Sequence, residues 1–240
     1  MKPYNKEEKT KSEEVREMFD NIAPKYDLLN HTLSAGIDKI WRRKVVNIVK
    51  RLKPQMVADI ATGTGDLAIS IAKRVKGVKV MGIDPSKGML EVARRKVSEA
   101  SLAESITLEV GSAEQLSSIS DNTFDAVTVA FGVRNFGNLE QGLKEIFRVL
   151  RPGGSVVILE FSNPTNPIIS HLYKWYSHKI LPRIGGAISK DRSAYEYLPA
   201  SVDEFPQPKR FTEILTQVGF SDSRARSLSF GIAQIYTAKR

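Results

Sequence analysis

The chain has 240 residues, of which 41% are hydrophobic and 26% are charged, and this composition excludes a disordered or fibrous protein. It contains no cysteine, which excludes a disulfide scaffold, a thiolate zinc site and a cysteine nucleophile. The net charge of +9 comes from the flanks, because residues 1–55 and 161–240 each carry +5 and residues 56–160 carry −1. A basic surface suits nucleic acid or an anionic membrane, and it equally suits a solubilising bias without a partner.

The first 55 residues are predicted to form a helical extension. Apolar residues recur at helical spacing over residues 12–23, with Ser12 as the N-cap and Pro24 as the stop. A second helix is predicted over residues 38–52, and Pro54 ends it. We expect residues 1–55 to act as a lid on residues 56–240, within one structural domain.

Strands and helices alternate in the rest of the chain. This alternation predicts βαβ units, and therefore a doubly wound α/β fold with a mostly parallel sheet. Ligands in such folds bind beyond the carboxyl ends of the strands. No apolar run is long enough to predict a transmembrane helix. Strands are predicted at residues 57–61, 79–84, 106–110, 124–129 and 155–161, and a closing pair within 220–238. Helices are predicted at 66–75 (capped by Asp66), 86–100, 139–150, 166–181 and 208–218. Irregular structure is predicted at 183–206.

A glycine-rich turn follows the first predicted strand. Gly63 and Gly65 let the backbone turn sharply and approach a ligand closely. With Ala68 they loosely match a dinucleotide fingerprint, but Asp59 at the strand end would repel a pyrophosphate. Asp84 ends the second strand, where a carboxylate accepts hydrogen bonds from ribose hydroxyls. S-adenosylmethionine (SAM) has a ribose and a cationic sulfonium but no phosphate, so it fits this set better than a nicotinamide cofactor.

A longer series of motifs supports this choice of cofactor. Asp59 opens the pattern D-x-x-x-G-x-G, Asp84 ends the next strand, and Ser112 and Ala113 follow the third, where small residues suit an adenine. Asp125 opens the fourth strand, and Arg-Val-Leu-Arg-Pro-Gly-Gly at 148–154 precedes the fifth. The series resembles the class I SAM-dependent methyltransferases. This resemblance implies a Rossmann-like sheet of seven strands whose last strand is antiparallel.

Two further stretches carry a closer resemblance. Residues 18–38 read Met-Phe-Asp-Asn-Ile-Ala-Pro-Lys-Tyr-Asp and onward into Trp41-Arg42, and residues 131–135 read Phe-Gly-Val-Arg-Asn. Both are similar to the ubiquinone and menaquinone biosynthesis C-methyltransferases, and the similarity covers nearly the whole chain. It implies transfer of a methyl group from SAM to a ring carbon of a polyprenylated quinol, with S-adenosylhomocysteine as the second product.

This closer resemblance also assigns residues. The chain departs from the family at Ala130, where relatives have a contacting serine, and at Asp38, where many relatives have histidine. The cofactor contacts that the resemblance implies are Thr64, Asp84, Ser112 and Ala113, beside Asp59, Gly63 and Gly65 of the turn.

The chemistry of a quinol acceptor suggests three catalytic residues. A quinone ring is electrophilic, so the acceptor must be the reduced hydroquinone, activated as an aryl-oxide in an enclosed site. Arg134 is a candidate to stabilise that oxide or to orient a water, and Asn135 is a candidate to hold the hydroxyl. His31 is a candidate base, although a single histidine is more often structural. The lid residues expected to bind the substrate are Tyr26, Asp27 and Asn30.

The partners follow from the flanking segments. Apolar and aromatic residues over 168–180 predict a prenyl-tail channel or an interfacial membrane contact, or else a core helix. We expect a cytoplasmic protein in peripheral contact with the inner face of the cell membrane, and its oligomeric state is left open. His171 and His178 have no acidic partner at metal-ligand spacing, so no metal is expected.

Several other functions are alternatives. The same C-methylation of a benzoquinol is one, and we favour demethylmenaquinol because residues 130–133 and the chain length look closer to menaquinone-only members. An RNA methyltransferase would also be basic, but the middle of the chain is slightly acidic and no RNA-binding module is evident, so no nucleic acid is expected. A lipid methyltransferase, a non-enzymatic SAM-binding protein and a nicotinamide oxidoreductase complete the alternatives.

Overall fold

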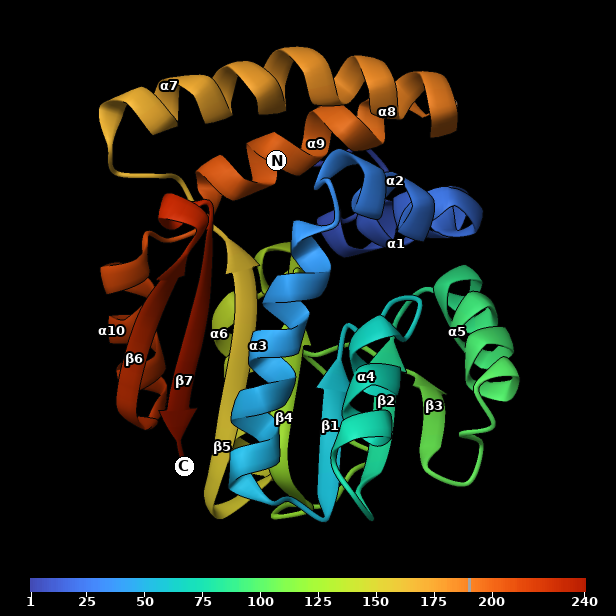
Figure 1. Ribbon diagram of the computed structural model, residues 1–240, viewed down its shortest axis with the longest axis vertical. Coiled ribbons are helices and arrows are strands. Elements are labelled where there is room, and N and C mark those ends of the chain that lie inside the picture. The colour runs from blue at the N-terminus through green and yellow to red at the C-terminus, as the bar shows by residue number, and fades with distance from the viewer. Residues whose placement is uncertain (190) are drawn as a thin grey trace.

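The computed structural model describes residues 1–189 and 191–240, and its centre is a seven-stranded sheet (Figure 1). The strand order is β3-β2-β1-β4-β5-β7-β6, in which the first five strands are parallel and β7 runs antiparallel to β5 and β6. The predicted doubly wound fold with an antiparallel last strand is confirmed. The strands are β1 (Met56–Ile60), β2 (Lys79–Asp84), β3 (Ile106–Val110), β4 (Phe124–Ala130), β5 (Leu150–Phe161), β6 (Ser221–Leu228) and β7 (Ala233–Lys239).

Amphipathic helices cover both faces of the sheet. On one face lie α3 (Ile37–Leu52) and α4 (Asp66–Arg74), with α5 (Lys87–Glu99) beside the β3 edge. On the other face lie α6 (Leu139–Val149) and α10 (Pro208–Val218). In α6 the residues Leu143, Ile146 and Val149 recur at helical spacing and are fully buried. Burial of each such side chain stabilises the fold by about 1.5–3 kcal/mol.

A group of helices lies across the carboxyl ends of the parallel strands, and we call it the roof (Figure 1). The roof comes from two distant parts of the chain. The Tyr4 hydroxyl donates a hydrogen bond to Asp191, and the Tyr176 hydroxyl donates one to the Leu33 carbonyl at 2.7 Å. The roof helices are α1 (Lys11–Ile22), α2 (Tyr26–Leu33), α7 (Pro167–Trp175), α8 (Leu181–Ser189) and α9 (Arg192–Glu204), with a π-helical turn (Tyr176–Ile180) between α7 and α8.

The irregular structure expected at 183–206 is wrong, because α8 and α9 occupy this segment. Glycine and proline are poor helix formers, yet Gly185, Gly186 and Pro199 lie within these two helices. In the structure, a Cβ at Gly185 would lie 2.2 Å from the Tyr195 ring, so glycine lets α8 pack directly against α9. Pro199 lies within α9.

Three predicted helix termini are also corrected. The N-cap of α1 is Thr10 rather than Ser12, since Thr10 and Glu13 form a reciprocal capping box. Pro24 does not end helical structure, because it lies in a 3-10 turn (Ala23–Lys25) that leads directly into α2. Asp66 is the first residue of α4, and Gly65 takes the cap position. The division of the chain at residue 55 stays a prediction, and α3, which lies before it, packs on the sheet.

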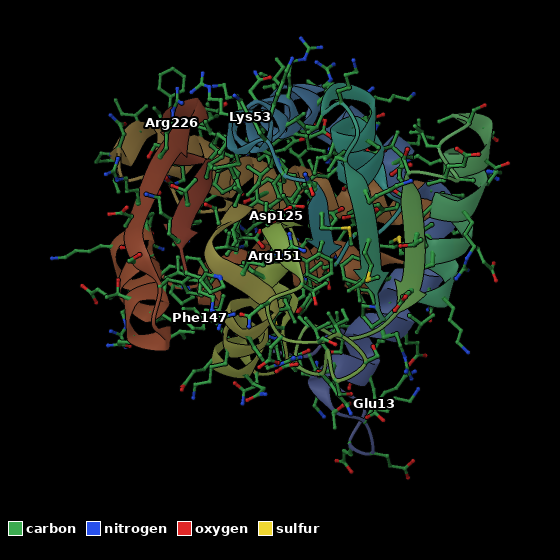
Figure 2. The ribbon with its side chains drawn as sticks, turned by 90° about the horizontal axis from the view of Figure 1, so that it is seen from below. Glu13, Lys53, Asp125, Phe147, Arg151 and Arg226 are labelled. Atoms are coloured by element: carbon green, nitrogen blue, oxygen red, sulfur yellow. The ribbon has the colours of Figure 1, made fainter. Side chains whose placement is uncertain are left out.

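The amino ends of the strands are held together at the pole opposite the roof. Asp125 accepts hydrogen bonds from the backbone N–H groups of Gln55 and Met56, at 2.8 and 2.9 Å, and forms an ion pair with Arg151. Figure 2, seen from this side, shows Asp125 and Arg151 next to each other. Asp125 therefore joins β1 to β4, far from the carboxyl ends where the site is expected.

Candidate active site

Two cavities lie between the sheet and the roof, and they meet at Tyr26 and Phe131. The first, of about 210 Å³, lies between α1 and the loops that follow β1 to β4, and we call it the strand-end cavity. The second, of about 450 Å³, lies among roof helices and α3, and we call it the roof cavity. The lining of the strand-end cavity includes Gly63, Asp84, Ser112, Ala113, Ala130 and Asn135, and that of the roof cavity includes Asn30, Trp41, Arg42, Arg134, Tyr173 and Leu198.

The glycine-rich turn after β1 adopts a left-handed backbone. Gly63 and Gly65 have φ values of 57° and 82°, which glycine adopts without steric cost. The turn also touches the loop after β4, where a Cβ on Gly132 would lie 2.5 Å from the Ala61 Cβ. The predicted use of glycine at this turn thus has a steric reason, and Gly63 lines the strand-end cavity.

Asp84 presents a buried carboxylate to the strand-end cavity. Its Oδ2 accepts a hydrogen bond from the Gly63 N–H at 2.8 Å, and its Oδ1 accepts one from the Ser86 N–H at 2.9 Å. Burial raises the pKa of Asp84 to about 6, against the lowering effect of these two hydrogen bonds. Each carboxylate oxygen keeps a second lone pair for a hydroxyl donor in the cavity.

Asp59, Thr64 and Gly65 lie behind the cavity lining. Asp59 is buried and accepts hydrogen bonds from the hydroxyls of Thr62 and Thr128, at 2.7 and 2.6 Å. Burial raises the pKa of Asp59 to about 6, against these two hydrogen bonds. The Asp59 carboxylate therefore fastens β1 to the glycine turn and to β4, and direct contacts of these three residues with a cofactor stay predictions.

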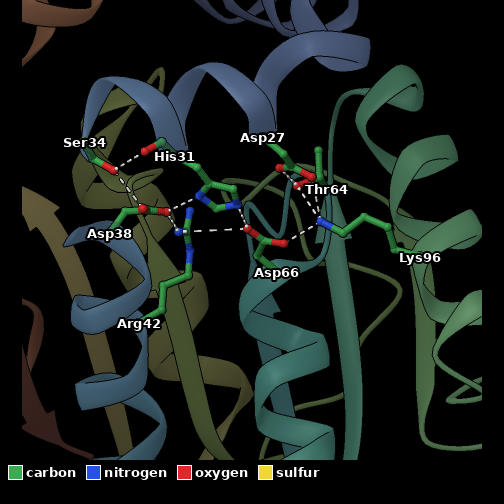
Figure 3. A network of polar contacts seen from close by, with 8 residues as sticks. All are labelled: Asp27, His31, Ser34, Asp38, Arg42, Thr64, Asp66 and Lys96. Atoms are coloured by element: carbon green, nitrogen blue, oxygen red, sulfur yellow. Dashed lines mark hydrogen bonds and ion pairs between the residues drawn. The ribbon is translucent and has the colours of Figure 1, made fainter. Parts of the chain in front are cut away.

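A polar network fastens α2 to α3, α4 and α5 (Figure 3). Asp27 accepts a hydrogen bond from the Thr64 hydroxyl and pairs with Lys96 at 2.7 Å. Lys96 also pairs with Asp66, which lies 3.5 Å from His31 Nε2. His31 Nδ1 is 2.8 Å from Asp38, which is also paired with Arg42. Asp27 and His31, predicted as substrate-binding and catalytic residues, thus hold the roof in place.

The Asp38 and Asp66 carboxylates of this network are held in their ionised forms. Burial opposes ionisation of Asp38, but the Ser34 hydroxyl, Arg42 and His31 outweigh it and lower the Asp38 pKa. Burial likewise opposes ionisation of Asp66, and the charges of Lys96 and Arg42 outweigh it and lower the Asp66 pKa. Asp38 and Asp66 therefore remain carboxylates at neutral pH.

Replacing His31 by glutamine is expected to lower kcat by less than about tenfold, because the ring acts on roof placement rather than on the reacting atoms. Loss of a true general base costs about 10²–10⁴-fold. Steady-state kinetics of His31→Gln, with Asp38→Asn as the matched variant in the same network, decide between the two roles. A loss above a hundredfold in His31→Gln alone would establish His31 as the base.

Arg134 forms a buried ion pair with Glu160 on β5. Its Nη1 donates to Glu160 Oε1 and to the Phe131 carbonyl, both at 2.6 Å, and its Nε donates to the Ser201 hydroxyl at 3.2 Å. Burial disfavours the charge on Arg134, but the Glu160 carboxylate outweighs burial and raises the Arg134 pKa. Among the described residues these bonds use Nε and Nη1, so Nη2 can face a ligand in the roof cavity, which Arg134 lines.

Asn135 and Tyr26 lie where the two cavities approach each other. The Asn135 Oδ1 accepts a hydrogen bond from the Tyr197 hydroxyl at 3.1 Å, so the side chain is oriented by α9. Asn135 lines the strand-end cavity, and Tyr26 lines both cavities. Asn30 lines the roof cavity. The structure thus brings together Asn135, Tyr26, Asn30 and Arg134 of the predicted site residues.

Phe131 and Glu160 are site residues that the sequence analysis did not single out. Phe131 has a left-handed φ of 59°, which is strained for a bulky residue. It is held there by Arg134 and by stacking on Phe161, with ring centroids 4.6 Å apart, and it lines both cavities. A signal for Glu160 was available, because a single charge within an apolar strand requires a buried partner.

Comparison with known proteins identifies the relatives of this chain. A family model described as the ubiE/COQ5 methyltransferase family matches residues 7–240. A demethylmenaquinone methyltransferase of Bacteroides fragilis is 47% identical over 240 residues, which are all of this chain and 97% of the relative. The chain belongs to the ubiE/COQ5 methyltransferase family. A ubiquinone/menaquinone biosynthesis C-methyltransferase of Geotalea daltonii is also 47% identical, over 96% of this chain and 97% of the relative. The predicted family and the predicted enzyme class, a SAM-dependent methyltransferase, are confirmed.

Solved structures that resemble this ubiE/COQ5 methyltransferase share its fold at low sequence identity. A SAM-dependent methyltransferase from Aquifex aeolicus has a TM-score of 0.57 at 20% identity, over 77% of this chain and 81% of its own. The [4+2]-cyclase SpnF has a TM-score of 0.68 at 16% identity, over 95% of this chain and 96% of its own. Because a cyclase shares the architecture, the chemistry has to be argued from the site rather than from the fold.

The strand-end cavity of this ubiE/COQ5 methyltransferase fits SAM. The Asp84 carboxylate offers acceptors for two ribose hydroxyls, and Gly63 leaves the backbone open beside it. Ser112 and the buried Ala113 provide a small-residue surface suited to an adenine. The residues predicted from the sequence to hold the ribose and the adenine therefore lie around one cavity.

Proposed function

We propose that this chain methylates a ring carbon of demethylmenaquinol and gives menaquinol. The observation that carries the proposal is the meeting of two cavities of different character at Tyr26 and Phe131. One offers hydroxyl acceptors for a nucleoside, and the other has aromatic and aliphatic walls that suit a ring with a prenyl tail. The name of the Bacteroides fragilis relative, which is identical at nearly half of the positions, supports this acceptor.

The residues at the junction prepare the acceptor. When bound, SAM supplies a methyl group on a cationic sulfonium, which only an electron-rich carbon attacks. Arg134 is proposed to stabilise an aryl-oxide through Nη2, and its contact with Glu160 through Nη1 supports this role by fixing the guanidinium. Since Arg134 itself stays protonated, a water hydrogen-bonded to Nη2 would relay the hydroxyl proton to bulk solvent. The proton lost from the ring carbon when the new C–C bond forms would return to the oxide oxygen and restore the hydroquinone. Tyr26 and Asn30 are proposed to position the ring, and Asn135 to hold its hydroxyl.

The same C-methylation of a polyprenyl benzoquinol is the second candidate. The name of the Geotalea daltonii relative covers both ubiquinone and menaquinone biosynthesis, and that relative is as identical to this chain as the Bacteroides fragilis protein. The two acceptors differ by a fused ring, so their relative kcat/KM values distinguish them.

Methyl transfer is expected only when the acceptor is reduced, because the quinone ring is electrophilic. Methyl-labelled SAM is incubated with the protein and short-tailed demethylmenaquinone, with and without dithionite, and label is followed into the organic phase. Label that appears only with dithionite supports the proposal. Absence of label with both naphthoquinol and benzoquinol, in protein that binds SAM by calorimetry, would contradict it.

We also propose that the enzyme works in the cytoplasm, in peripheral contact with the inner face of the cell membrane, because a polyprenyl substrate resides in the bilayer. Within residues 1–189 and 191–240, the structure has no helix that is both long and apolar enough to cross a membrane. Peripheral contact would therefore have to come from surface residues of the described chain.

A further inference from the structure

Helix α7 exposes a row of large apolar side chains. Ile168, Leu172 and Trp175 follow one another at helical spacing, and their exposed fractions are 80%, 62% and 53%. Every residue of α7 is at least partly exposed, and Figure 1 shows the helix lying across the outer surface of the roof. A contiguous apolar row of this kind on a helix indicates an interaction surface.

A second exposed apolar residue lies beside the start of α7. Phe230, in the turn Ser229–Gly231 between β6 and β7, is 80% exposed and has a left-handed φ of 59°. Gly231 lies against Pro164, and the Ser162 hydroxyl donates to the Gly231 carbonyl, so this turn is fastened to the segment that leads into α7. A bulky residue that is both strained and exposed suggests a use outside the fold itself.

The segment that contains α7 is positively charged, and Asp203 of α9, which lies 3.1 Å from His178, is an acidic residue that contacts it. Residues 161–190 contain no Asp or Glu, whereas Lys174, Lys179 and Arg183 are exposed bases on the roof segment that begins with α7. Apolar side chains flanked by basic ones are the arrangement with which interfacial helices bind anionic bilayers. The charge therefore favours a lipid surface over a neutral apolar partner.

The same elements line the roof cavity on their inner side. Tyr173 and Tyr176 come from α7 and the π-helical turn, and Ser229 and Ile232 flank Phe230. The exposed apolar residues and the cavity are thus separated by one layer of structure. A molecule that leaves a bilayer at this face would have only this layer between it and the roof cavity.

We propose that Ile168, Leu172, Trp175 and Phe230, with Lys174, Lys179 and Arg183, form a docking face that binds the surface of an anionic bilayer. The apolar side chains insert between the lipid headgroups and the bases contact lipid phosphates. This docking presents the roof cavity to the membrane. The inference rests on the proposed function for the identity of the lipid-borne substrate, and docking itself is measured without substrate.

Binding to vesicles tests the docking face. Cosedimentation with vesicles of phosphatidylglycerol and phosphatidylcholine is compared with cosedimentation with phosphatidylcholine alone, in the absence of SAM and quinone. We expect binding to the anionic vesicles only, a loss of about tenfold or more in Leu172→Glu, and a loss of about fivefold in Lys179→Glu that grows smaller in high salt. The matched controls are Leu52→Glu and Lys53→Glu, which lie at the C-terminal end of α3, at the pole away from the roof (Figure 2 shows Lys53 there). Both are expected to bind vesicles as the unaltered protein does.

Methylation of quinols with long and short tails distinguishes the docking face from the proposed function. Leu172→Glu is expected to lower kcat/KM about tenfold for a long-tailed quinol in vesicles and to leave kcat/KM unchanged for a short-tailed quinol in solution. Vesicle binding without methylation of any quinol would overturn the proposed function and keep the docking face. Methylation of the short-tailed quinol, with vesicle binding absent or unaltered in Leu172→Glu, would overturn the docking face. Conversion of a dimer to a monomer by Leu172→Glu, measured by light scattering, would also overturn it and assign the row to a second copy of the chain.

Discussion

Replacing Glu160 by leucine is expected to lower the free energy of unfolding by about 3–5 kcal/mol, because the buried Arg134 guanidinium loses its carboxylate partner. Urea denaturation followed by circular dichroism measures this loss. The double variant Arg134→Met/Glu160→Leu is expected to recover most of it, since no unpaired charge is then left in the interior. Lys144→Ala, which breaks the exposed Glu140–Lys144 pair, serves as the control and is expected to leave the free energy of unfolding nearly unchanged.

The stable double variant also tests the role of Arg134 in the reaction. Loss of one preorganised donor to a developing negative charge lowers kcat by about 10²–10³-fold. We therefore expect Arg134→Met/Glu160→Leu to fold, to bind SAM and to turn over at least a hundredfold more slowly. An unchanged kcat in this variant would show that the pair only supports the structure.

Replacing Asp84 by asparagine is expected to raise the Kd for SAM about a hundredfold. Hydrogen bonds to a charged group contribute about 1.5–3 kcal/mol each. A carboxylate offers one acceptor oxygen to each of the two ribose hydroxyls, whereas the asparagine amide has only one acceptor oxygen and a donor NH2 group. Isothermal titration calorimetry measures the change. Asp59→Asn is the matched control, because Asp59 lies behind the cavity lining, and its Kd is expected to change far less.

The Kd for SAM is expected to depend on pH through the ionisation of Asp84. The Asp84 pKa is about 6 in the protein, so the carboxylate ionises as pH rises from 5 to 7.5, and an ionised carboxylate accepts hydroxyl bonds more strongly. The Kd is therefore expected to fall over this range. The free energy of unfolding of the protein without SAM is expected to fall over the same pH rise. An acid whose pKa is raised by folding contributes its full stability below its pKa in the unfolded chain, and this contribution is lost as pH rises through about 6. A Kd in Asp84→Asn that still falls with pH would assign the effect to another group.

The central sheet and the nucleoside half of the site were predictable from the sequence. Each depends on patterns that are local in the chain: buried runs ended by turn residues, and Gly63 and Asp84 at the ends of neighbouring strands. Because parallel strands bring their carboxyl ends to one edge, order along the chain is enough to place these residues together.

The roof cavity depends on contacts between segments that are far apart in the sequence. Arg134 was identified as a candidate, but its partner Glu160 comes from a strand 26 residues later, and the two are joined only by the sheet. His31 was assigned a chemical role because of its residue type, whereas its neighbours Asp38 and Asp66 occupy both sides of the ring. Helices α8 and α9 were missed because Gly185 breaks a helix in isolation but permits close packing against Tyr195.

The roof joins the two ends of the chain, and this has a consequence for the order in which the molecule folds. Tyr4 bonds to a residue 187 positions away, and Tyr176 to one 143 positions away, whereas residues 56–160 form a contiguous βαβ unit. During synthesis, this unit therefore leaves the ribosome before α7, α8 and α9 can meet the roof helices of the N-terminal segment. Ordering contacts of such separation also costs more chain entropy than ordering neighbouring ones. We accordingly expect the roof to be the last part of the fold to close and the first to open, so that a long-tailed molecule would reach the roof cavity through local opening while the sheet stays intact.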